Sequence, residues 1–193
     1  MKEIEIRGKL NKRGFNKLKF FLGKQAKLLD NYKRLSVDLS PGFDLKTRGW
    51  KKLKNSTFDL RLKKSGDSEK ISLKFGKFHL KEREEIEVKL KEGQFLDTLK
   101  LLETLRFNKG MIYIWESWEY EYDGFEIKIS KYTDDYYTWE IESENLKKDP
   151  CKLADILSLK PYTKAEYRKT IDWENHNIHK LYSFKLVKEL LRQ

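Results

Sequence analysis

The feature that most constrains the fold of this chain is the strict alternation of apolar and charged residues at its start. In an extended strand, Ile4 and Ile6 point to one face, and the other face carries Glu3, Glu5, Arg7 and Lys9. Charged residues are poor strand formers, and like charges side by side on one face repel. The stretch is therefore either a solvated edge strand, which is the commoner case, or part of a site that needs these charges.

Later stretches alternate in the same way, which predicts a large antiparallel sheet. They cover residues 58–63, 71–76, 83–90 and 136–142. In addition, Asp123-Gly124 is a hairpin signal between residues 111–122 and residues 125–129. The polar faces of the alternating stretches carry, in order, Asp59, Arg61, Lys63, Lys74, Arg83, Glu85, Glu87, Lys89, Glu140 and Glu142.

Helical periodicity interrupts the strands in two places. Residues 16–29 have an imperfect apolar stripe that includes Leu28 and Leu29, and residues 93–107 have the strongest helical pattern of the chain. Between these two helices, residues 32–39 are expected to form a strand.

The pattern becomes helical after residue 145. Short helices are expected at residues 152–159 and 184–191, and a capping box predicts a helix that starts at Thr163. We therefore expect a strand-rich domain at residues 1–145, with residues 146–193 as a helical extension that packs on it.

Composition narrows the ligand class. The 193 residues carry a net charge of +11, with 16 basic against 6 acidic residues in positions 1–60 and 4 against 11 in positions 111–150. A basic half beside an acidic segment favours an anionic ligand. The single Cys151, the absence of a signal peptide and the absence of a long apolar run lead us to expect a cytoplasmic protein with no membrane contact.

Many antiparallel strands tend to close into a barrel. The two predicted helices could cover an apolar outer surface, which would turn the charged faces inward. An empty lumen lined with both signs of charge would be costly. A hard divalent cation held by carboxylates, together with a polyanion held by Arg and Lys, would balance it.

Five short motifs resemble the CYTH family, the triphosphate tunnel metalloenzymes. Residues 3–7 are similar to the family's ExExK signature, with Arg in place of Lys, and residues 59–63 are similar to its basic third strand. Residues 71–74 resemble the LxLK strand, residues 83–87 the RxExE strand, and residues 140–142 the closing EIE. Each motif alone matches many proteins, but here all five stand in the family order, with a predicted helix after the first and fourth.

The resemblance implies an α+β fold in which an eight-stranded antiparallel barrel, or tunnel, has flanking helices. It also implies a small phosphorylated substrate, such as inorganic triphosphate, a nucleoside triphosphate or thiamine triphosphate. The cofactor would be Mg²⁺ or Mn²⁺, and a metal-activated water would attack the terminal phosphate. Cyclisation of ATP to cyclic AMP is a variant outcome in the same family.

The resemblance assigns roles to residues of the five motifs. Glu3, Glu5, Glu140 and Glu142 would hold the metal ion. Arg7, Lys9, Arg61, Lys63, Lys74 and Arg83 would bind phosphate oxygens, and Glu3, Glu5, Arg7 and Lys74 would be the catalytic residues. Glu85 and Glu87 would be secondary ligands or would position the basic side chains.

The sequence departs from the family pattern on two strands. The family usually has a Lys and an Arg on the strand entered at Met111, where this chain has Trp115 and Ser117. It usually has an Asp at the end of the next strand, where this chain has Ser130 followed by Lys131. Two cations and one carboxylate of the expected set are therefore missing, which implies a different substrate or weak turnover.

Several other residues have ordinary interpretations. Trp115 is interpreted as a core residue, with stacking on a base as the alternative. Asp134 and Asp135 are interpreted as turn residues, although one of them could replace the missing Asp. The three histidines, His79, His176 and His179, have no convincing metal spacing and are interpreted as surface residues.

Three functions remain open from the sequence. The first is a metal-dependent triphosphatase, and the second is a binding module that captures a phosphorylated ligand without turnover. The third is a basic nucleic-acid binder, which ranks last because carboxylates share the polar faces with the cations. A monomer and a homodimer are both compatible with the sequence.

Overall fold

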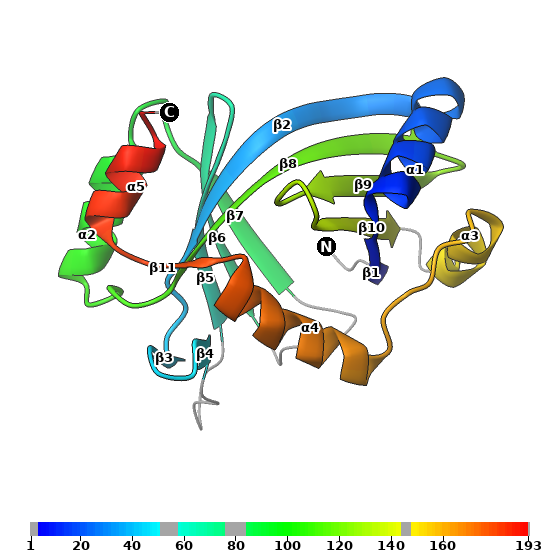
Figure 1. The fold of residues 1–193 in the computed structure, drawn as a ribbon. Helices are drawn as coiled ribbons and strands as arrows, with labels where there is room; N and C mark the ends of the chain where they lie inside the picture. The colour runs from blue at the N-terminus through cyan, green and yellow to red at the C-terminus, as the bar shows by residue number, and fades with distance from the viewer. Residues whose placement is uncertain (1–3, 51–57, 76–83, 144–147, 193) are drawn as a thin grey trace. The chain divides into compact units, whose positions relative to one another are not determined.

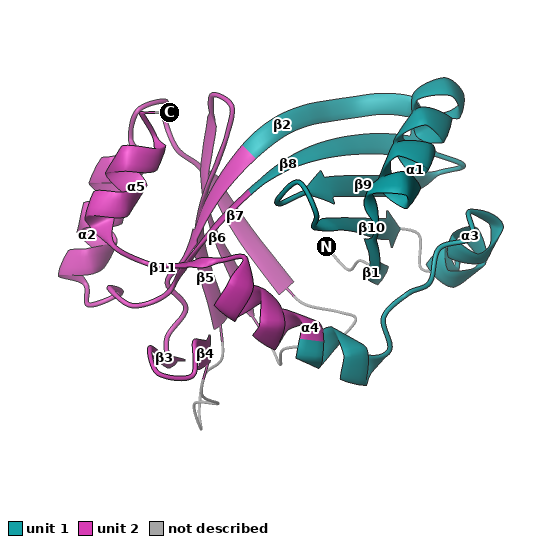
Figure 2. Cartoon of the chain, viewed as in Figure 1, with its two compact units in different colours: residues 1–33, 115–169 teal, residues 34–114, 170–193 magenta. Residues whose placement is uncertain are grey.

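The computed structural model describes residues 4–50, 58–75, 84–143 and 148–192. Within them the chain has an α+β fold, with a large antiparallel sheet and five helices (Figure 1). It forms two compact units, residues 1–33 with 115–169 and residues 34–114 with 170–193 (Figure 2). The long strands β2 (Lys27–Asp38) and β8 (Met111–Tyr122) each contribute to both units.

The first unit is a sheet with helices on its apolar face. Its strands follow the order β1 (Ile4–Leu10), β10 (Tyr137–Ser143), β9 (Phe125–Lys131) and β8. Helices α1 (Lys12–Gln25) and α3 (Pro150–Ile156) pack on that face. The core that results contains Phe15, Leu18, Leu22, Tyr120, Ile127, Ile129, Trp139, Ile141 and Leu153.

Helix α1 lies four residues earlier than the sequence predicts. The side chain of Asn11 caps it by accepting a hydrogen bond from the Gly14 amide at 2.7 Å, and the chain is already extended at Ala26. Leu28 and Leu29, which were expected in the helical stripe, are exposed residues of β2 instead. The prediction was wrong because the cap, and not the apolar spacing, decides where this helix begins.

The second unit has the strand order β2, β5 (Phe58–Ser65), β6 (Ser68–Phe75) and β7 (Glu84–Lys89). Helices α2 (Phe95–Thr104) and α5 (Phe184–Leu190) pack on its apolar residues, among them Leu35, Val37, Leu60, Leu62, Phe95, Leu99, Leu102 and Val187. The unit also contains the short pair β3 (Phe43–Asp44) and β4 (Gly49–Trp50), and β11 (Lys180–Leu181) beside β8.

The buried carboxylate of Glu69 anchors α2 to this sheet. Its Oε2 accepts a hydrogen bond from the Phe95 amide at 2.8 Å, and its Oε1 pairs with the ammonium of Lys64 at 2.8 Å. A carboxylate at a helix N-terminus is favourable because free amides and the positive end of the helix dipole lie there. This contact helps to fix the first turn of α2 to the sheet.

The other elements agree well with the sequence. Asp123 and Gly124 both have positive φ angles, 52° and 69°, as the predicted tight hairpin between β8 and β9 requires. The capping box at the start of α4 (Lys164–Asn177) is confirmed by reciprocal hydrogen bonds between Thr163 and Glu166. Helices α3, α4 and α5 lie in the region predicted to be helical, and the description of residues 146–193 as one extension stays a prediction.

An antiparallel sheet is confirmed, but a closed barrel is not. The path of paired strands ends at β1 and β7, and no pairing closes it among the described residues. Among the residues that the structure describes, no helix has the length and apolar character needed to cross a membrane.

Gly110 provides a stability test because a Cβ atom there would lie 1.8 Å from the carbonyl oxygen of Asp38. Backbone cannot move aside at low cost, so we expect Gly110→Ala to lower the free energy of unfolding by about 3 kcal/mol. At Gly49, the nearest atoms to an added Cβ are 3.8 Å away, so Gly49→Ala should cost less than about 1 kcal/mol. Urea denaturation of both variants measures the difference, and equal costs would contradict the prediction.

Candidate functional site

The polar face of the first unit carries a row of alternating charges across four strands. The register places Arg7 of β1 opposite Glu140 of β10, Glu140 opposite Lys128 of β9, and Lys128 opposite Glu119 of β8. We call these four residues the mixed-charge row. Their side chains are only 14–20% exposed, so they do not form an ordinary solvated surface.

A second row on the same face is entirely acidic. It runs through Glu5, Glu142, Glu126 and Glu121. Each of these residues lies two positions along its strand from a member of the mixed-charge row. Where the two rows meet, Glu5, Glu140 and Glu142 form a carboxylate cluster in which one oxygen from each residue lies within 4.8 Å of the others. Three convergent carboxylates are the ligand type that hard divalent cations prefer.

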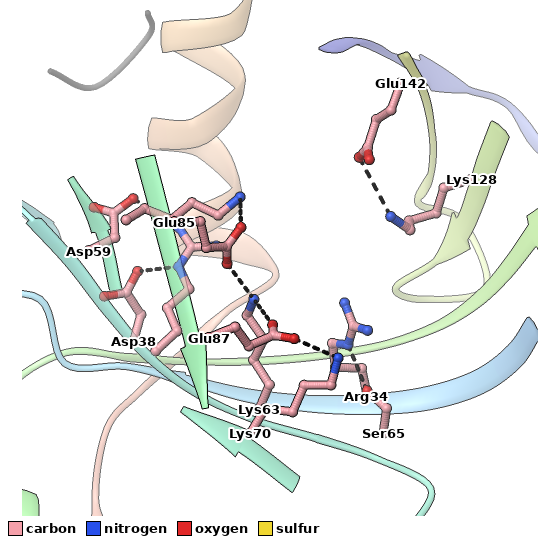
Figure 3. Close-up of polar contacts among 12 residues, drawn as sticks. Arg34, Asp38, Asp59, Lys63, Ser65, Lys70, Glu85, Glu87, Lys128 and Glu142 are labelled. Carbon is pink, nitrogen blue, oxygen red and sulfur yellow. Dashed lines mark hydrogen bonds and ion pairs between the residues drawn. The ribbon is translucent and has the colours of Figure 1, made fainter. Parts of the chain in front are cut away.

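Lys128 is the main positive charge beside this cluster. Its ammonium lies 3.3 Å from Glu119, 3.5 Å from Glu126 and 3.6 Å from Glu142, and the pair with Glu142 is drawn in Figure 3. Burial opposes the charged form, but Glu142, Glu140 and Glu119 outweigh it and hold the pKa of Lys128 well above its ordinary value. Lys128 is therefore a permanent cation on this face.

The ionisation of Glu142 is strongly perturbed. Burial raises its pKa to about 8, and the neighbouring carboxylates Glu140, Glu5 and Glu126 add to the effect, while Lys128 opposes it. Lys128 and Arg7 are fewer than the carboxylates around them, so a further positive charge would stabilise the ionised form of Glu142.

Two of the three positions where the chain departs from the family pattern lie next to each other. Ser117 of β8 and Ser130 of β9 are opposite in the register, and their hydroxyl oxygens are 2.7 Å apart in a buried hydrogen bond. A cation is expected at the first position and an Asp at the second, so a neutral pair stands where opposite charges were expected. The loss of these two charges is balanced, whereas Trp115 replaces a second expected cation with no matching loss of a carboxylate.

The second unit carries an ion-pair network on the polar face of β5, β6 and β7. Glu85 lies 3.2 Å from the ammonium of Lys63 and 3.0 Å from that of Lys74, and Glu87 lies 2.7 Å from that of Lys70 (Figure 3). Burial favours the neutral form of Glu85, but Lys63 and Lys74 outweigh it and lower its pKa. The carboxylates thus hold the lysine side chains in fixed positions on the sheet.

Arg61 is held by two buried carboxylates. Its Nε donates to Asp38 Oδ2 at 3.1 Å, and Nη2 lies 3.8 Å from Asp59 Oδ2. The other oxygen of the Asp38 carboxylate, Oδ1, accepts a hydrogen bond from the Ser40 amide at 3.0 Å and a second one from the Ser40 hydroxyl. The guanidinium also lies over the ring of Tyr113, at 5.8 Å from the centroid. About a third of the Arg61 side chain remains exposed, so this fixed cation is still accessible.

The structure brings the predicted site residues together in two groups. The first unit combines Glu5, Arg7, Glu140 and Glu142, with Lys9 two residues further along β1 over the ring of Tyr136. The second unit combines Arg61, Lys63, Lys74, Glu85 and Glu87. Glu3 and Arg83 lie outside the described residues, as do His79 and the lysines at 51, 52 and 54.

Sequence reasoning missed Lys128, Glu119 and Asp38. The sequence does indicate that Lys128 lies on the polar face of β9. Polar and apolar residues alternate there, with Glu126, Lys128 and Ser130 between Phe125, Ile127 and Ile129. That alternation already placed Lys128 on the polar face, but no family motif marks it. Asp38 gave no signal, because only the fold brings it to Arg61.

The interpretation of the histidines and turn acids needs one correction. His179 is not a surface residue: it is 8% exposed and packs edge-on against Tyr113, with ring centroids 4.2 Å apart. The packing follows from the position of its segment beside β8, which spacing in the sequence cannot show. Asp134 is an exposed turn residue whose carboxylate pairs with Lys131 at 2.8 Å.

No family model matches the sequence, and no curated protein matches it. Solved structures do match. The PH1012 protein of Pyrococcus horikoshii OT3 aligns with a TM-score of 0.60 at 17% identity, over 85% of this chain and 93% of that one. A candidate adenylate cyclase of Bacillus halodurans aligns with a TM-score of 0.56 at 16% identity, over 84% and 93%. A second candidate adenylate cyclase, from Vibrio parahaemolyticus, aligns with a TM-score of 0.51 at 12% identity, over 98% of both chains.

The chain has a CYTH-type fold. The α+β fold with a large antiparallel sheet that the sequence resemblance implies is thereby confirmed, and the closed barrel is not. In this CYTH-type fold, the charged motif residues that the structure describes lie on the polar faces of β1, β5, β6, β7 and β10. The opposite faces of β1, β5, β6 and β10 pack against the hydrophobic clusters, whereas Ile86 and Val88 of β7 are exposed.

The raised pKa of Glu142 predicts a specific pH dependence of stability. The folded state binds the Glu142 proton more tightly than the unfolded state, whose pKa is near 4.5, so the proton stabilises the fold. This contribution is complete below about pH 4.5 and is lost as the pH rises towards 8. In Glu142→Gln the side chain is neutral throughout.

In metal-free buffer, the free energy of unfolding of Glu142→Gln should therefore exceed that of the wild type by an amount that grows between pH 5 and pH 8.5. We expect a growth of about 1–3 kcal/mol. Urea denaturation at five pH values measures it. A difference that stays constant with pH would show that Glu142 ionises normally.

Proposed function

We propose that the protein hydrolyses a triphosphate substrate with Mg²⁺ or Mn²⁺ as its cofactor. The observation that carries the proposal is the carboxylate cluster of Glu5, Glu140 and Glu142 on the same face as Arg7 and Lys128. Convergent carboxylates are suited to a divalent ion, and partly buried cations beside them are suited to phosphate oxygens. A face with carboxylates alone would favour only a metal site, and a face with basic side chains alone would favour only an anion site.

The donor set fits a hard divalent ion. Glu5, Glu140 and Glu142 supply oxygen ligands from two adjacent strands, and Glu3 would add a fourth by the sequence resemblance. A bound ion would act as a Lewis acid and lower the pKa of a bound water so that it becomes a nucleophile at neutral pH. In our proposal, Arg7 and Lys128 bind phosphate oxygens and stabilise the negative charge that develops during in-line attack.

The second unit carries cations of its own. We propose that Arg61, Lys63 and Lys74 bind phosphate oxygens, as the resemblance implies. Support comes from the way each is fixed: Asp38 holds Arg61, and Glu85 holds both lysines. Fixed cations need little reorganisation when the substrate charge changes, which favours transition-state stabilisation.

Two alternatives each rest on a specific observation. The neutral pair of Ser117 and Ser130, at positions where the family pattern has a cation and an Asp, favours a binding module with little or no turnover. The description of two structural neighbours as candidate adenylate cyclases favours cyclisation of ATP. Product analysis with ATP separates all three functions, because hydrolysis of the terminal phosphate releases ADP and phosphate, cyclisation releases cyclic AMP and pyrophosphate, and binding alone releases no product.

The decisive experiment supplies tripolyphosphate and ATP with Mg²⁺ or Mn²⁺ and measures phosphate, pyrophosphate and cyclic AMP. We expect phosphate release that a chelator abolishes. In the double variant Glu5→Gln, Glu140→Gln, Mn²⁺ affinity measured by calorimetry and phosphate release should both fall by at least about 100-fold, because two of three ligands are lost.

The matched control is Glu121→Gln, which changes an exposed carboxylate in the same acidic row but outside the cluster. It should retain metal affinity and activity within about twofold. Tight triphosphate binding without product would establish the binding module instead. Full activity in the double variant would exclude the proposed metal site.

A further inference from the structure

The polar face of the first unit changes character along its strands. Beyond the acidic row and the mixed-charge row comes a row of hydroxyls, with Ser117, Ser130 and Thr138 in register across β8, β9 and β10. These three side chains are 0–4% exposed. Beyond this row the side chains are aromatic: Trp115 lies on β8, Tyr132 directly follows β9, and Tyr136 directly precedes β10. We call these three residues the aromatic row.

The aromatic row consists of Trp115, Tyr132 and Tyr136. The rings of Trp115 and Tyr132 are stacked, with centroids 5.6 Å apart and an interplanar angle of 25°. Tyr136 is buried and packs edge-on against Tyr132 at 5.8 Å, and the ammonium of Lys9 lies 4.9 Å from the Tyr136 ring centroid. Trp115 and Tyr132 remain partly exposed, so Tyr136 supports the stack from within the protein.

The spacing of the rows matches the layout of a nucleotide. Trp115 is four residues from Glu119 on β8, and Tyr132 is four residues from Lys128 on β9. At about 3.3 Å per residue, the aromatic row lies about 13 Å from the mixed-charge row, with the hydroxyl row midway. In a nucleoside triphosphate, the base, the ribose hydroxyls and the terminal phosphates follow one another over a comparable span.

We propose that Trp115 and Tyr132 stack against the base of a nucleoside triphosphate whose phosphates lie at the mixed-charge row. The inference rests on the proposed function and narrows its substrate class from any triphosphate to one with a planar aromatic ring. Base–aromatic stacking tolerates any base because each has a π face, so the aromatic row selects for a ring and not for one particular base.

Aromatic residues at a strand end also occur as ordinary core, and the position of this stack argues against that role. The core of the first unit is formed by the opposite face of the sheet, where Tyr120, Ile127 and Trp139 pack on the helices. Trp115 comes two residues before Ser117 and Tyr132 comes two residues after Ser130, the two residues of the hydroxyl pair. Neither aromatic residue belongs to the two hydrophobic clusters that the described residues form.

The test compares ligands with and without a ring. Calorimetry measures the affinity of a non-hydrolysable ATP analogue and of tripolyphosphate, each with Mg²⁺, for the wild type and for Trp115→Ala. We expect Trp115→Ala to weaken binding of the ATP analogue by about 5- to 100-fold and to change tripolyphosphate binding less than twofold. Trp115→Phe keeps a ring and should recover most of the affinity, which also shows that loss of folding is not the cause.

Trp173→Ala is the matched control because it removes a tryptophan that is 43% exposed on α4. It should leave both affinities unchanged. An equal loss for both ligands in Trp115→Ala, no loss for either, or no binding of the ATP analogue to the wild type would overturn the proposal.

The same measurements separate this proposal from the proposed function. If no triphosphate is hydrolysed but the ATP analogue binds and Trp115→Ala weakens it selectively, the aromatic row is established and the triphosphatase is not. If tripolyphosphate is hydrolysed and Trp115→Ala affects both ligands alike, the triphosphatase stands and the aromatic row does not.

Discussion

Much of this protein depends on how charge is compensated on the inner strands of a sheet. In the first unit, Lys128 is surrounded by Glu119, Glu126 and Glu142, and Arg7 pairs with Glu140. Removing charged groups from water is costly unless each finds an opposite charge. Two cations do not match the carboxylates of this face, and the raised pKa of Glu142 is the physical sign of that imbalance. This shortage of positive charge supports the divalent cation that we propose for this face.

In the second unit, the site residues are mainly basic. There the cations Arg61, Lys63 and Lys74 dominate, and the carboxylates hold them in place and lower their mutual repulsion. Asp38 and Glu85 are therefore important for orientation as much as for charge. In the first unit, the neutral hydroxyl pair of Ser117 and Ser130 stands where the family pattern has a cation and an Asp. These two departures offset each other in charge, while Trp115 replaces a second cation without such an offset.

Secondary structure could be predicted from alternation and turn chemistry to a large extent. The hairpin at Asp123-Gly124 and the capping box at Thr163 are as expected, because both depend on backbone geometry within a few residues. The helix α1 was misplaced because one side-chain cap at Asn11 outweighed a weak apolar stripe. Closure of the sheet into a barrel was not predictable in the same sense, since it depends on pairing between residues far apart in the sequence.

The sequence by itself determined which side chains share a face, because in a strand the side-chain period of two allows no other arrangement. That was enough to group Glu5 with Arg7, and Glu140 with Glu142. Only the tertiary structure decided the register between strands, and with it the distances. The register makes Lys128 the neighbour of Glu140, and it gives Arg61 its partner Asp38. The physical reason is that strand pairing and side-chain packing over long sequence separations set the register, and no local pattern encodes them.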